Sequence, residues 1–441
     1  MNKEINSHQK QREWFGKIPF NWQSAKLKRL IKSASSGGTP DSSNDSFYSD
    51  AGVPWVTISD ITNSSQIKNT AKHITDEAIN DKNLKIYPKG TILLAMYASV
   101  GKVAELCTEA SINQAILAIS VDTSKMSNNY IKFCFNAYEP YIKSESNGTT
   151  QFNLNANKVL NLSFPLPTLK EQNEISKWIS EKSFDIDQLI SNQEKQIEKL
   201  KEYRQAIITK AVTKGLDSNA PMKDSGVEWI GEIPENWSTI RIKNVSWLKG
   251  RIGWDGLKSS EFIDSGPYLI TGTDFSNGSI NWKTCAHISE ERYLQDELLH
   301  IKENDLLITK DGTIGKLAIV KNCPEKVSLN SGVMIIRNDT AFKYSNRYLY
   351  YVLQSNQFLL WYELSQSGNS TIKHLYQAQF YNFEFSYPSL NEQSNIANYL
   401  DERCSKIGLL LDSFEQKISK LKAYKQSLIY EYVTGKKRVS L

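Results

Sequence analysis

The sequence lacks long hydrophobic runs and has few cysteines. No apolar stretch approaches the ~20 residues that a membrane-spanning helix needs, and residues 1–12 are polar, unlike a secretion signal. The five cysteines are scattered and form no C-x-x-C pair, which argues against a disulfide framework and against a structural zinc site. We therefore expect a cytoplasmic protein whose cysteines are buried, reduced thiols.

Motifs of catalysis are also missing. The Gly-Lys pairs lack the remaining residues of a phosphate-binding P-loop, and Gly250, Gly253 and Gly256 are wrongly spaced for a dinucleotide-binding turn. No Asn-Pro-Pro-aromatic tetrad of an amino-methyltransferase occurs, and the histidines show no i,i+4 pair for a metal. The only nuclease-like Asp/Glu-x-Lys triplet, residues 415–417, falls on a predicted coiled-coil helix. We expect no catalytic residue, no metal and no cofactor in this chain.

What the sequence does contain is one pattern that occurs twice, about half a chain apart. The matching segments are residues 14–22 (WFGKIPFNW) and 229–237 (WIGEIPENW), 167–172 (PTLKEQ) and 388–393 (PSLNEQ), and 197–203 (IEKLKEY) and 418–424 (ISKLKAY). Units this long are too large for a solenoid repeat. We interpret the chain as a tandem duplication with approximate two-fold symmetry.

Each half is predicted to end in a long helix. Thr168 with Glu171 and Ser389 with Glu392 have the spacing of capping boxes, and glycines follow the last periodic residues. In between, apolar residues recur at alternating steps of three and four, as in a coiled-coil seam. The residues predicted to pair the helices are Ile186, Ile190, Ile197, Leu200, Ile207, Ile407, Leu411, Phe414, Ile418, Leu421 and Leu428.

One such helix cannot bury its apolar stripe alone, so we expect the two helices to pair antiparallel within the chain, with a globular block at each end. Arg204 and Lys425 occupy the same seam position. We favour stems packed in the seam with charged heads in water, and a contact with a partner protein is the alternative. From Ile186 to Ala211 the seam spans roughly 38 Å at ~1.5 Å per residue.

The globular blocks are rich in short β-type runs, which predicts strand-rich α+β domains. The expected domains are residues 1–166, a helix over 167–216, residues 217–387 and a helix over 388–441. A net charge of +5 permits nucleic-acid binding without establishing it.

Loops at matching places in both blocks combine glycine with hydroxyl, amide and basic residues, the types that contact base edges and phosphates. Each loop alone is compatible with an ordinary turn, and Trp254 is also compatible with a core position. The residues predicted to bind DNA are Ser35, Gly37, Gly38, Thr39, Tyr97, Ser99, Lys102, Asn147, Thr149, Thr150, Gln151, Lys249, Arg251, Trp254, Lys310, Thr313, Lys316, Asn369, Ser370, Thr371 and Lys373.

These features together resemble the specificity subunits of type I restriction–modification enzymes. Residues 37–40 (GGTP), 53–60 (VPWVTISD) and 90–94 (GTILL) are similar to recurrent phrases of the family's target recognition domains. The order of block, helix, block, helix extends the resemblance over nearly the whole chain. The second block has residues 250–253 (GRIG) in place of GGTP, which favours unlike half-sites and an asymmetric DNA target.

The resemblance implies a sequence-specific double-stranded DNA-binding subunit without catalytic activity. Each block would read one half of a split site, and the paired helices would fix the gap. Two methyltransferase subunits carrying S-adenosylmethionine would dock on the helices and methylate adenines. Motor–nuclease restriction subunits would then supply translocation and cleavage that depend on ATP and Mg. A self-contained restriction–methylation enzyme, which the missing motifs disfavour, and a non-DNA scaffold with two spaced domains remain alternatives.

A base pair rises ~3.4 Å, so a seam of roughly 38 Å predicts half-site centres about 10–11 base pairs apart.

Two substitutions test the loop assignments. Lys373→Ala or Arg251→Ala is expected to weaken DNA binding without harming the fold, because each removes a positive charge. Unchanged affinity across a salt titration would count against these loops.

Overall fold

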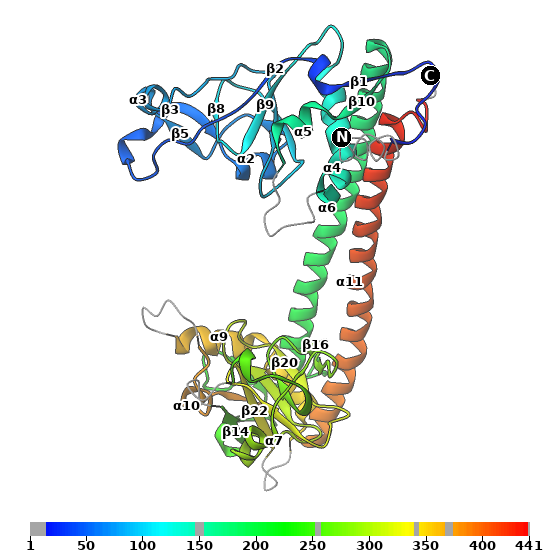
Figure 1. Cartoon of the computed structure of the whole chain (residues 1–441). Helices are drawn as coiled ribbons and strands as arrows, with labels where there is room; N and C mark the ends of the chain where they lie inside the picture. The colour runs from blue at the N-terminus through cyan, green and yellow to red at the C-terminus, as the bar shows by residue number, and fades with distance from the viewer. Residues whose placement is uncertain (1–14, 146–153, 252–256, 339–343, 367–373, 440–441) are drawn as a thin grey trace. The chain divides into compact units, whose positions relative to one another are not determined.

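The computed structural model describes residues 15–145, 154–251, 257–338, 344–366 and 374–439 (Figure 1). The chain divides into two compact units, residues 1–193 with 416–441 and residues 194–415. Each unit combines one strand-rich block with parts of two long helices, α6 (Leu169–Lys214) and α11 (Leu390–Val433). The expected class, two α+β blocks with two long helices, is confirmed.

The block of the first unit is built on a five-stranded sheet of order β2-β9-β6-β7-β4, a three-stranded sheet of order β5-β3-β8, and the pair β1–β10. Its elements are β1 (Gln23–Lys26), β2 (Ile31–Ser36), β3 (Tyr48–Val56), α2 (Ile58–Asn63), β4 (Gln66–Ile67), β5 (Lys72–Ile74), α3 (Asp76–Asp81), β6 (Ile92–Ala95), β7 (Val103–Leu106), β8 (Ser111–Ile112), β9 (Ile116–Val121), α4 (Asn128–Glu145), α5 (Ala156–Leu160) and β10 (Ser163–Leu166).

The block of the second unit has a four-stranded sheet of order β14-β22-β19-β20, a three-stranded sheet of order β18-β15-β21, and the pair β13–β23. Its elements are β11 (Met222–Asp224), β12 (Glu232–Pro234), β13 (Ser238–Arg241), β14 (Ser246–Gly250), β15 (Ile263–Ile270), β16 (Phe275–Ser276), β17 (Ser279–Ile280), β18 (Ala286–His287), α7 (Glu290–Leu294), β19 (Leu306–Thr309), β20 (Leu317–Ile319), β21 (Val327–Leu329), β22 (Val333–Asn338), α8 (Asn346–Val352), α9 (Asn356–Ser365), α10 (Gln377–Phe380) and β23 (Glu384–Tyr387).

The two blocks share one topology. The order β2-β9-β6-β7 corresponds to β14-β22-β19-β20, and in both three-stranded sheets the central strand has one antiparallel and one parallel neighbour. The central strands β6 and β19 are buried along their whole length, which explains why residues 92–95 and 306–309 are continuously apolar except for one threonine. The sequence duplication is therefore a duplication of fold.

Both long helices begin with the predicted capping box. The amide of Glu171 donates to the Thr168 hydroxyl (3.3 Å), and its carboxylate accepts from the Thr168 amide (3.0 Å). Burial alone would raise the pKa of Glu171, but hydrogen bonds from Thr168 and the Trp22 indole hold that pKa below its ordinary value. At α11 the carboxylate of Glu392 accepts the equivalent indole bond from Trp237 (3.1 Å).

The glutamine after each of these glutamates connects the helix start to its block. Gln172 is fully buried; its oxygen accepts from the Ser127 amide (2.9 Å) and its nitrogen donates to the Pro167 carbonyl (3.0 Å). Gln393 repeats both bonds with Ser345 and with the proline of its own helix start. An amide with both ends bonded in a buried site satisfies the polar groups there, which accounts for the repeated Glu-Gln pair.

Each block also holds the end of the other long helix. In the first unit the Tyr130 hydroxyl donates to the Val433 carbonyl in the last turn of α11 (3.1 Å). In the second unit the Tyr348 hydroxyl donates to the Val212 carbonyl near the end of α6 (3.2 Å). These carbonyls lie where a helix has no further amides to bond. The tyrosines supply donors there, and the Val212 carbonyl also accepts from Ser386 and from Gln357 (3.3 Å).

Inside each unit the two helices run antiparallel. In the first unit the Trp178 and Tyr432 rings stack at 3.9 Å, and further along α6 Asp187 pairs with Lys425 (2.7 Å). Partner numbers on α11 fall as numbers on α6 rise. In the second unit the later part of α6, around Ile208, shares a core cluster with the early part of α11, around Ile396 and Leu400.

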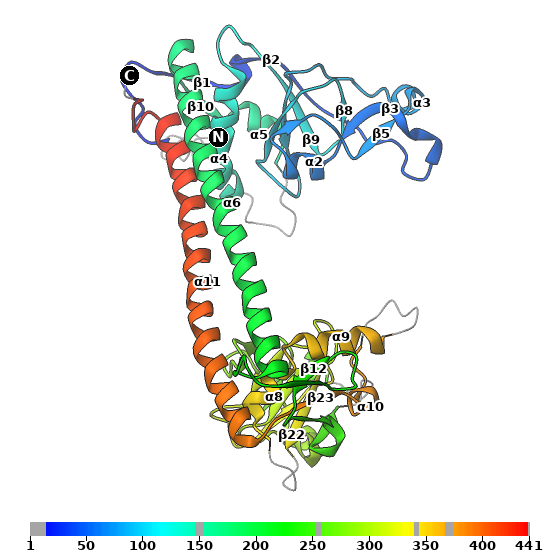
Figure 2. The same cartoon turned by 180° about the vertical axis from the view of Figure 1, so that it is seen from behind.

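The seam residues are buried to different degrees. Ile186, Ile190, Ile197, Ile407, Ile418 and Leu428 are buried, and Leu200, Ile207, Leu411, Phe414 and Leu421 are half-buried. The helices extend beyond the seam at both ends, 46 residues in α6 and 44 in α11, because their first and last turns pack on the blocks (Figure 2). Among the described helices, none has the length and apolar character to cross a bilayer.

Two glycines, one inside α11 and one just after it, give opposite predictions. Gly435 follows α11 with φ +72°, and a Cβ there would lie 2.4 Å from the Pro19 ring. Gly408 lies inside α11 with open space around it. Gly435→Ala should lower the free energy of unfolding by about 2 kcal/mol, and Gly408→Ala should raise it by about 0.5–1 kcal/mol. Urea unfolding of both variants measures this, and equal shifts would contradict the close packing of the α11 end on Pro19.

Candidate nucleic-acid interface

The strongest candidate in each block is the turn between two core strands: the β6–β7 turn (residues 96–102) and the β19–β20 turn (residues 310–316). In the first, the Gly101 amide donates to the Ala95 carbonyl (3.1 Å); in the second, the Gly315 amide donates to the Thr309 carbonyl (3.0 Å). Both turns therefore close with the same backbone hydrogen bond.

The left-handed residues of the turns also coincide. Ala98 (φ +57°) and Gly101 (φ +87°) in the first turn match Gly312 (φ +67°) and Gly315 (φ +83°) in the second. Only glycine adopts this conformation without strain, so Ala98 is held in it by the surrounding turn. The two blocks thus present one backbone shape with different side chains on it.

A second loop of each block ends beside the turn. The Leu154 amide donates to the Met96 carbonyl (3.1 Å), and the Leu375 amide donates to the Lys310 carbonyl (3.0 Å). The loop positions predicted before these anchors fall outside the described residues, as does Trp254. These positions are Asn147, Thr149, Thr150, Gln151, Asn369, Ser370, Thr371 and Lys373.

Several predicted side chains lie on the surface of the turns. Tyr97 is 43% exposed. The Ser99 hydroxyl accepts from Thr62 (2.8 Å), and Lys102 is exposed while forming an ion pair with Glu139 (3.4 Å). In the second turn Thr313 and Lys316 are both exposed. Hydroxyl and ammonium groups in such positions are able to meet bases and phosphates.

The Gly-Gly-Thr segment of the first block packs against its own sheets. A Cβ on Gly37 would lie 2.0 Å from the Ile112 carbonyl oxygen, and the Gly38 carbonyl accepts from the Trp55 indole (3.2 Å). The Thr39 hydroxyl accepts from the Asn113 side-chain amide (3.0 Å), and the Ser35 hydroxyl contacts the Tyr87 hydroxyl. Close strand packing accounts for these small residues.

The basic residues predicted around β14 do not face solvent freely. Arg251 is 2% exposed, and its guanidinium donates to the Leu329 carbonyl (3.1 Å) and the Ser328 hydroxyl (3.3 Å). Lys310 is buried and donates to the Arg251 carbonyl (3.1 Å); burial lowers the pKa of Lys310. Lys249 is half-buried in an ion pair with Asp296 (3.1 Å). The expectation that Arg251 is a removable surface charge needs correction, because its guanidinium belongs to the interior.

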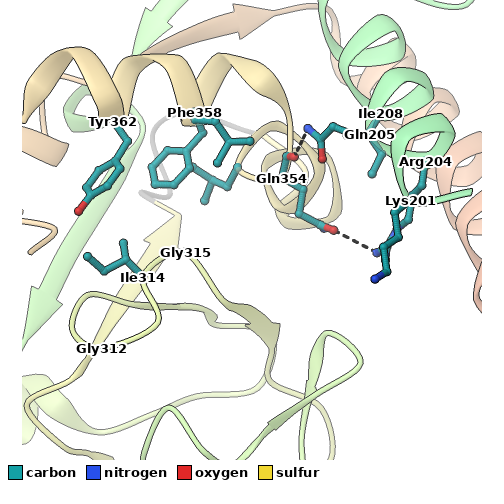
Figure 3. A pocket seen from close by; sticks show the side chains of 12 residues that line it. Lys201, Arg204, Gln205, Ile208, Gly312, Ile314, Gly315, Gln354, Phe358 and Tyr362 are labelled. Atoms are coloured by element: carbon teal, nitrogen blue, oxygen red, sulfur yellow. Dashed lines mark hydrogen bonds between the residues drawn. The ribbon is translucent and has the colours of Figure 1, made fainter. Parts of the chain in front are cut away.

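A cavity of about 550 Å³ lies between the β19–β20 turn, α6 and α9. Figure 3 shows Lys201 and Arg204 of α6 on one side and Phe358 and Tyr362 of α9 on another, with Gly312, Ile314 and Gly315 of the turn beneath the α9 side chains. Gln354 links the sides: its oxygens accept from Arg204 (3.2 Å) and from a further α6 side chain. The cavity is therefore basic at one end and aromatic at the other.

Two polar atoms in this cavity are buried and have no hydrogen-bond partner in the described part of the chain, Arg204 Nε and the Tyr362 hydroxyl. The sequence motifs do not predict this cavity. The sequence repeat does hold one signal of how the helices contact their blocks, because Gln205 and Gln426 occupy matching helix positions. Gln205 donates to the Gln354 carbonyl (2.7 Å), and Gln426 donates to the Asn136 carbonyl (2.8 Å). This repeated contact joins each helix to its block.

No group of three or more potential metal ligands gathers among the described residues. The cysteines are free thiols, of which Cys134, Cys285 and Cys404 are buried. Cys107 and Cys323 are only half-buried, so the expectation of full burial is wrong for those two. In the described part of the chain, the chemistry of the turns is that of hydrogen bonding and charge.

Comparison with known proteins gives a consistent picture. A family model described as "Type I restriction modification DNA specificity domain" matches residues 19–202 and again 234–420. The MjaVIII type I restriction enzyme specificity subunit of Methanocaldococcus jannaschii is 26% identical over 369 residues, 82% of each chain. The EcoBI specificity subunit of Escherichia coli is 23% identical, covering 83% of this chain and 76% of its own.

A solved structure from a study of complex assembly and conformational transition of the type I R-M system shares the fold. It aligns with a TM-score of 0.70 at 17% identity, covering 95% of this chain and 98% of its own. At that identity the likeness concerns the fold alone. The double match of the family model falls on the two halves that share one topology.

Arg251 and Lys316 separate a structural charge from an exposed one. Arg251→Ala should lower the free energy of unfolding by about 2–3 kcal/mol, because it leaves buried acceptors without their charged donor. Lys316→Ala should change it by less than about 0.5 kcal/mol and should weaken binding to duplex DNA in a salt-dependent way. Chemical unfolding and DNA titration of both variants test the pair; a stable Arg251→Ala protein would contradict the interior role.

Proposed function

The chain belongs to the type I restriction modification DNA specificity domain family, and from this membership we propose that each strand-rich block reads one half of a split DNA site. As a specificity subunit it is the non-catalytic component of a type I restriction–modification system. The proposal concerns which parts of the chain meet DNA and partners. Its main support is the pair of matched turns, because one backbone shape occurs in both blocks with different exposed side chains.

The charge around the turns supports contact with a polyanion. Lys102 and Lys316 close the two turns at equivalent positions and are exposed. Beside the second turn, Lys201 and Arg204 of α6 add positive charge at the cavity. Ammonium and guanidinium groups bind phosphates and orient the protein on the duplex, and they also recognise guanine, while hydroxyl, amide and carboxylate groups contact other base edges. The turns would therefore contact bases, and the cations in and beside them would also bind the DNA backbone.

The paired helices would set the distance between the two half-sites. A helix pair with a buried apolar seam is stiff, and its length is fixed by ~1.5 Å per residue. The antiparallel pairing inside each unit, together with the bonds from Gln172 and Gln393 to their blocks, supports this role. Half-site centres about 10–11 base pairs apart remain our expectation for the target.

Exposed apolar side chains on the helices support docking of partner subunits. On the first unit a shallow cavity of about 360 Å³ is lined by Leu189, Leu421 and Tyr424 together with Lys417 and Lys420. On the second unit Leu409 and Leu410 are 68% and 48% exposed. Exposed apolar groups of this kind mark protein interfaces. We propose that two methyltransferase subunits, one at each unit, bind here.

The remaining partners follow from the family and stay predictions. S-adenosylmethionine would be carried by the methyltransferase subunits, and ATP and Mg by the motor–nuclease subunits that join them. The cytoplasmic location expected from the sequence is likewise a prediction. The alternative of a self-contained enzyme loses its basis, because specificity subunits carry no catalytic centre.

Shortening both helices tests the spacing role. Deleting one heptad from the middle of each helix keeps the seam facing its partner and removes about 10 Å of length. The gap between methylated half-sites should shrink by about three base pairs, since each rises ~3.4 Å. Mapping of methylated adenines in cells that express the variant with its methyltransferase measures the gap. The same heptad deleted from α6 alone should abolish methylation, and an unchanged gap in the double deletion would contradict the proposal.

A further inference from the structure

Resting on the proposed DNA-reading role, we propose that Tyr97 and Asp311 are specificity-determining residues that make the two half-sites different. Both lie on the matched turns, and both are exposed, by 43% for the whole Tyr97 residue and by 42% for the Asp311 side chain. They differ in charge, size and hydrogen-bonding ability. Two DNA-reading turns with the same backbone shape would recognise different bases if the side chains at this equivalent position differ.

Their equivalence follows from backbone contacts on either side. Tyr97 comes directly after Met96, whose carbonyl accepts from Leu154, and Asp311 comes directly after Lys310, whose carbonyl accepts from Leu375. Each is followed by a left-handed residue, Ala98 or Gly312. The two side chains therefore leave the same point of the same turn.

The chemistry of Asp311 restricts what it can meet on DNA. An ionised carboxylate only accepts hydrogen bonds and is repelled by phosphates. The base groups that donate to it in the major groove are the exocyclic amino groups of cytosine and adenine, and cytosine N4 is its usual partner. A carboxylate on a DNA-facing turn thus indicates contact with a base, and we expect that base to be cytosine.

The surroundings of Asp311 hold the carboxylate in place without neutralising it through the neighbouring lysine. His374 Nδ1 contacts one carboxylate oxygen, and the His374 carbonyl accepts from Gln366 (3.3 Å). The Lys310 ammonium is directed inward to the Arg251 carbonyl. One oxygen of Asp311 is positioned by the imidazole, and the exposed remainder of the carboxylate is presented to solvent.

Tyr97 offers a different set of contacts. Its ring provides an apolar face that suits the thymine methyl group, and its hydroxyl both donates and accepts. The hydroxyl of the neighbouring Ser99 is engaged with Thr62, whereas Tyr97 is exposed. The first half-site should therefore not share the amino-base preference of the second at the equivalent position.

The test uses the full chain in complex with its methyltransferase subunits, selecting from duplex DNA with a randomised sequence. Wild-type protein should select a motif in two parts. Asp311→Asn should shift the preferred base at one position of one half from cytosine toward adenine by about ten- to a hundredfold, because asparagine pairs bidentately with adenine. The other half of the motif serves as the control and should be unchanged. Tyr97→Asp should introduce an amino-base preference in that other half.

The possible outcomes distinguish a failure of the proposed DNA-reading function from a failure of the assignment of Tyr97 and Asp311. If wild-type protein selects no motif, the proposed DNA-reading function is wrong, and this inference falls with it. If wild-type protein selects a motif and Asp311→Asn leaves every position unchanged, the inference alone is overturned. Uniform weakening at all positions of both halves would also overturn it, since that result indicates a structural role. Tyr97→Asp provides an independent reading should Asp311→Asn fail to fold.

Discussion

The structure depends on how each block holds the beginning of one long helix and the end of the other. Gln172 and Gln393 bond the helix starts to their blocks, and Tyr130 and Tyr348 cap the helix ends that arrive from the other half of the chain. A buried carbonyl without a donor costs about 1–3 kcal/mol, so the donors that the blocks supply to these carbonyls favour this arrangement. Antiparallel pairing follows, because each unit must contain one start and one end.

On the proposed DNA-reading role, this arrangement would let two blocks of one topology carry two independent specificities. The core strands β6 and β19 are buried on both faces, and the turns that follow them close with the same hydrogen bonds. Side chains at Tyr97 and Asp311 are free to differ since neither contributes to the core. Change at these positions would alter DNA preference while leaving the helix contacts, and therefore the docking of partners, as they are.

The sequence was sufficient to predict the parts that repeat. Capping boxes, seam periodicity and the WxGxIPxxW segments depend on local patterns, so α6, α11 and the duplicated blocks could be inferred. The sequence did not predict the direction in which a side chain points at the end of a strand. Arg251 and Lys310 are residue types that bind phosphates, yet both side chains point inward. The cavity beside the second turn was also beyond reach, because Lys201, Gly312 and Tyr362 meet only after folding. The recurrence of similar loop composition in both blocks identified the turns. It did not distinguish a close-packed residue such as Gly37 from an exposed residue that could contact DNA.

Intramolecular antiparallel pairing of α6 with α11 is the central claim, and carbodiimide crosslinking of the unmodified chain tests it most directly. Asp187 and Lys425 lie 2.7 Å apart, and the aspartate is exposed, so the reagent should join them by an amide bond. Peptide mass spectrometry of the monomeric fraction should detect this link, and Lys425→Arg should abolish it. If no link between α6 and α11 forms while Glu290 and Lys326 become joined within the second block, the account is contradicted.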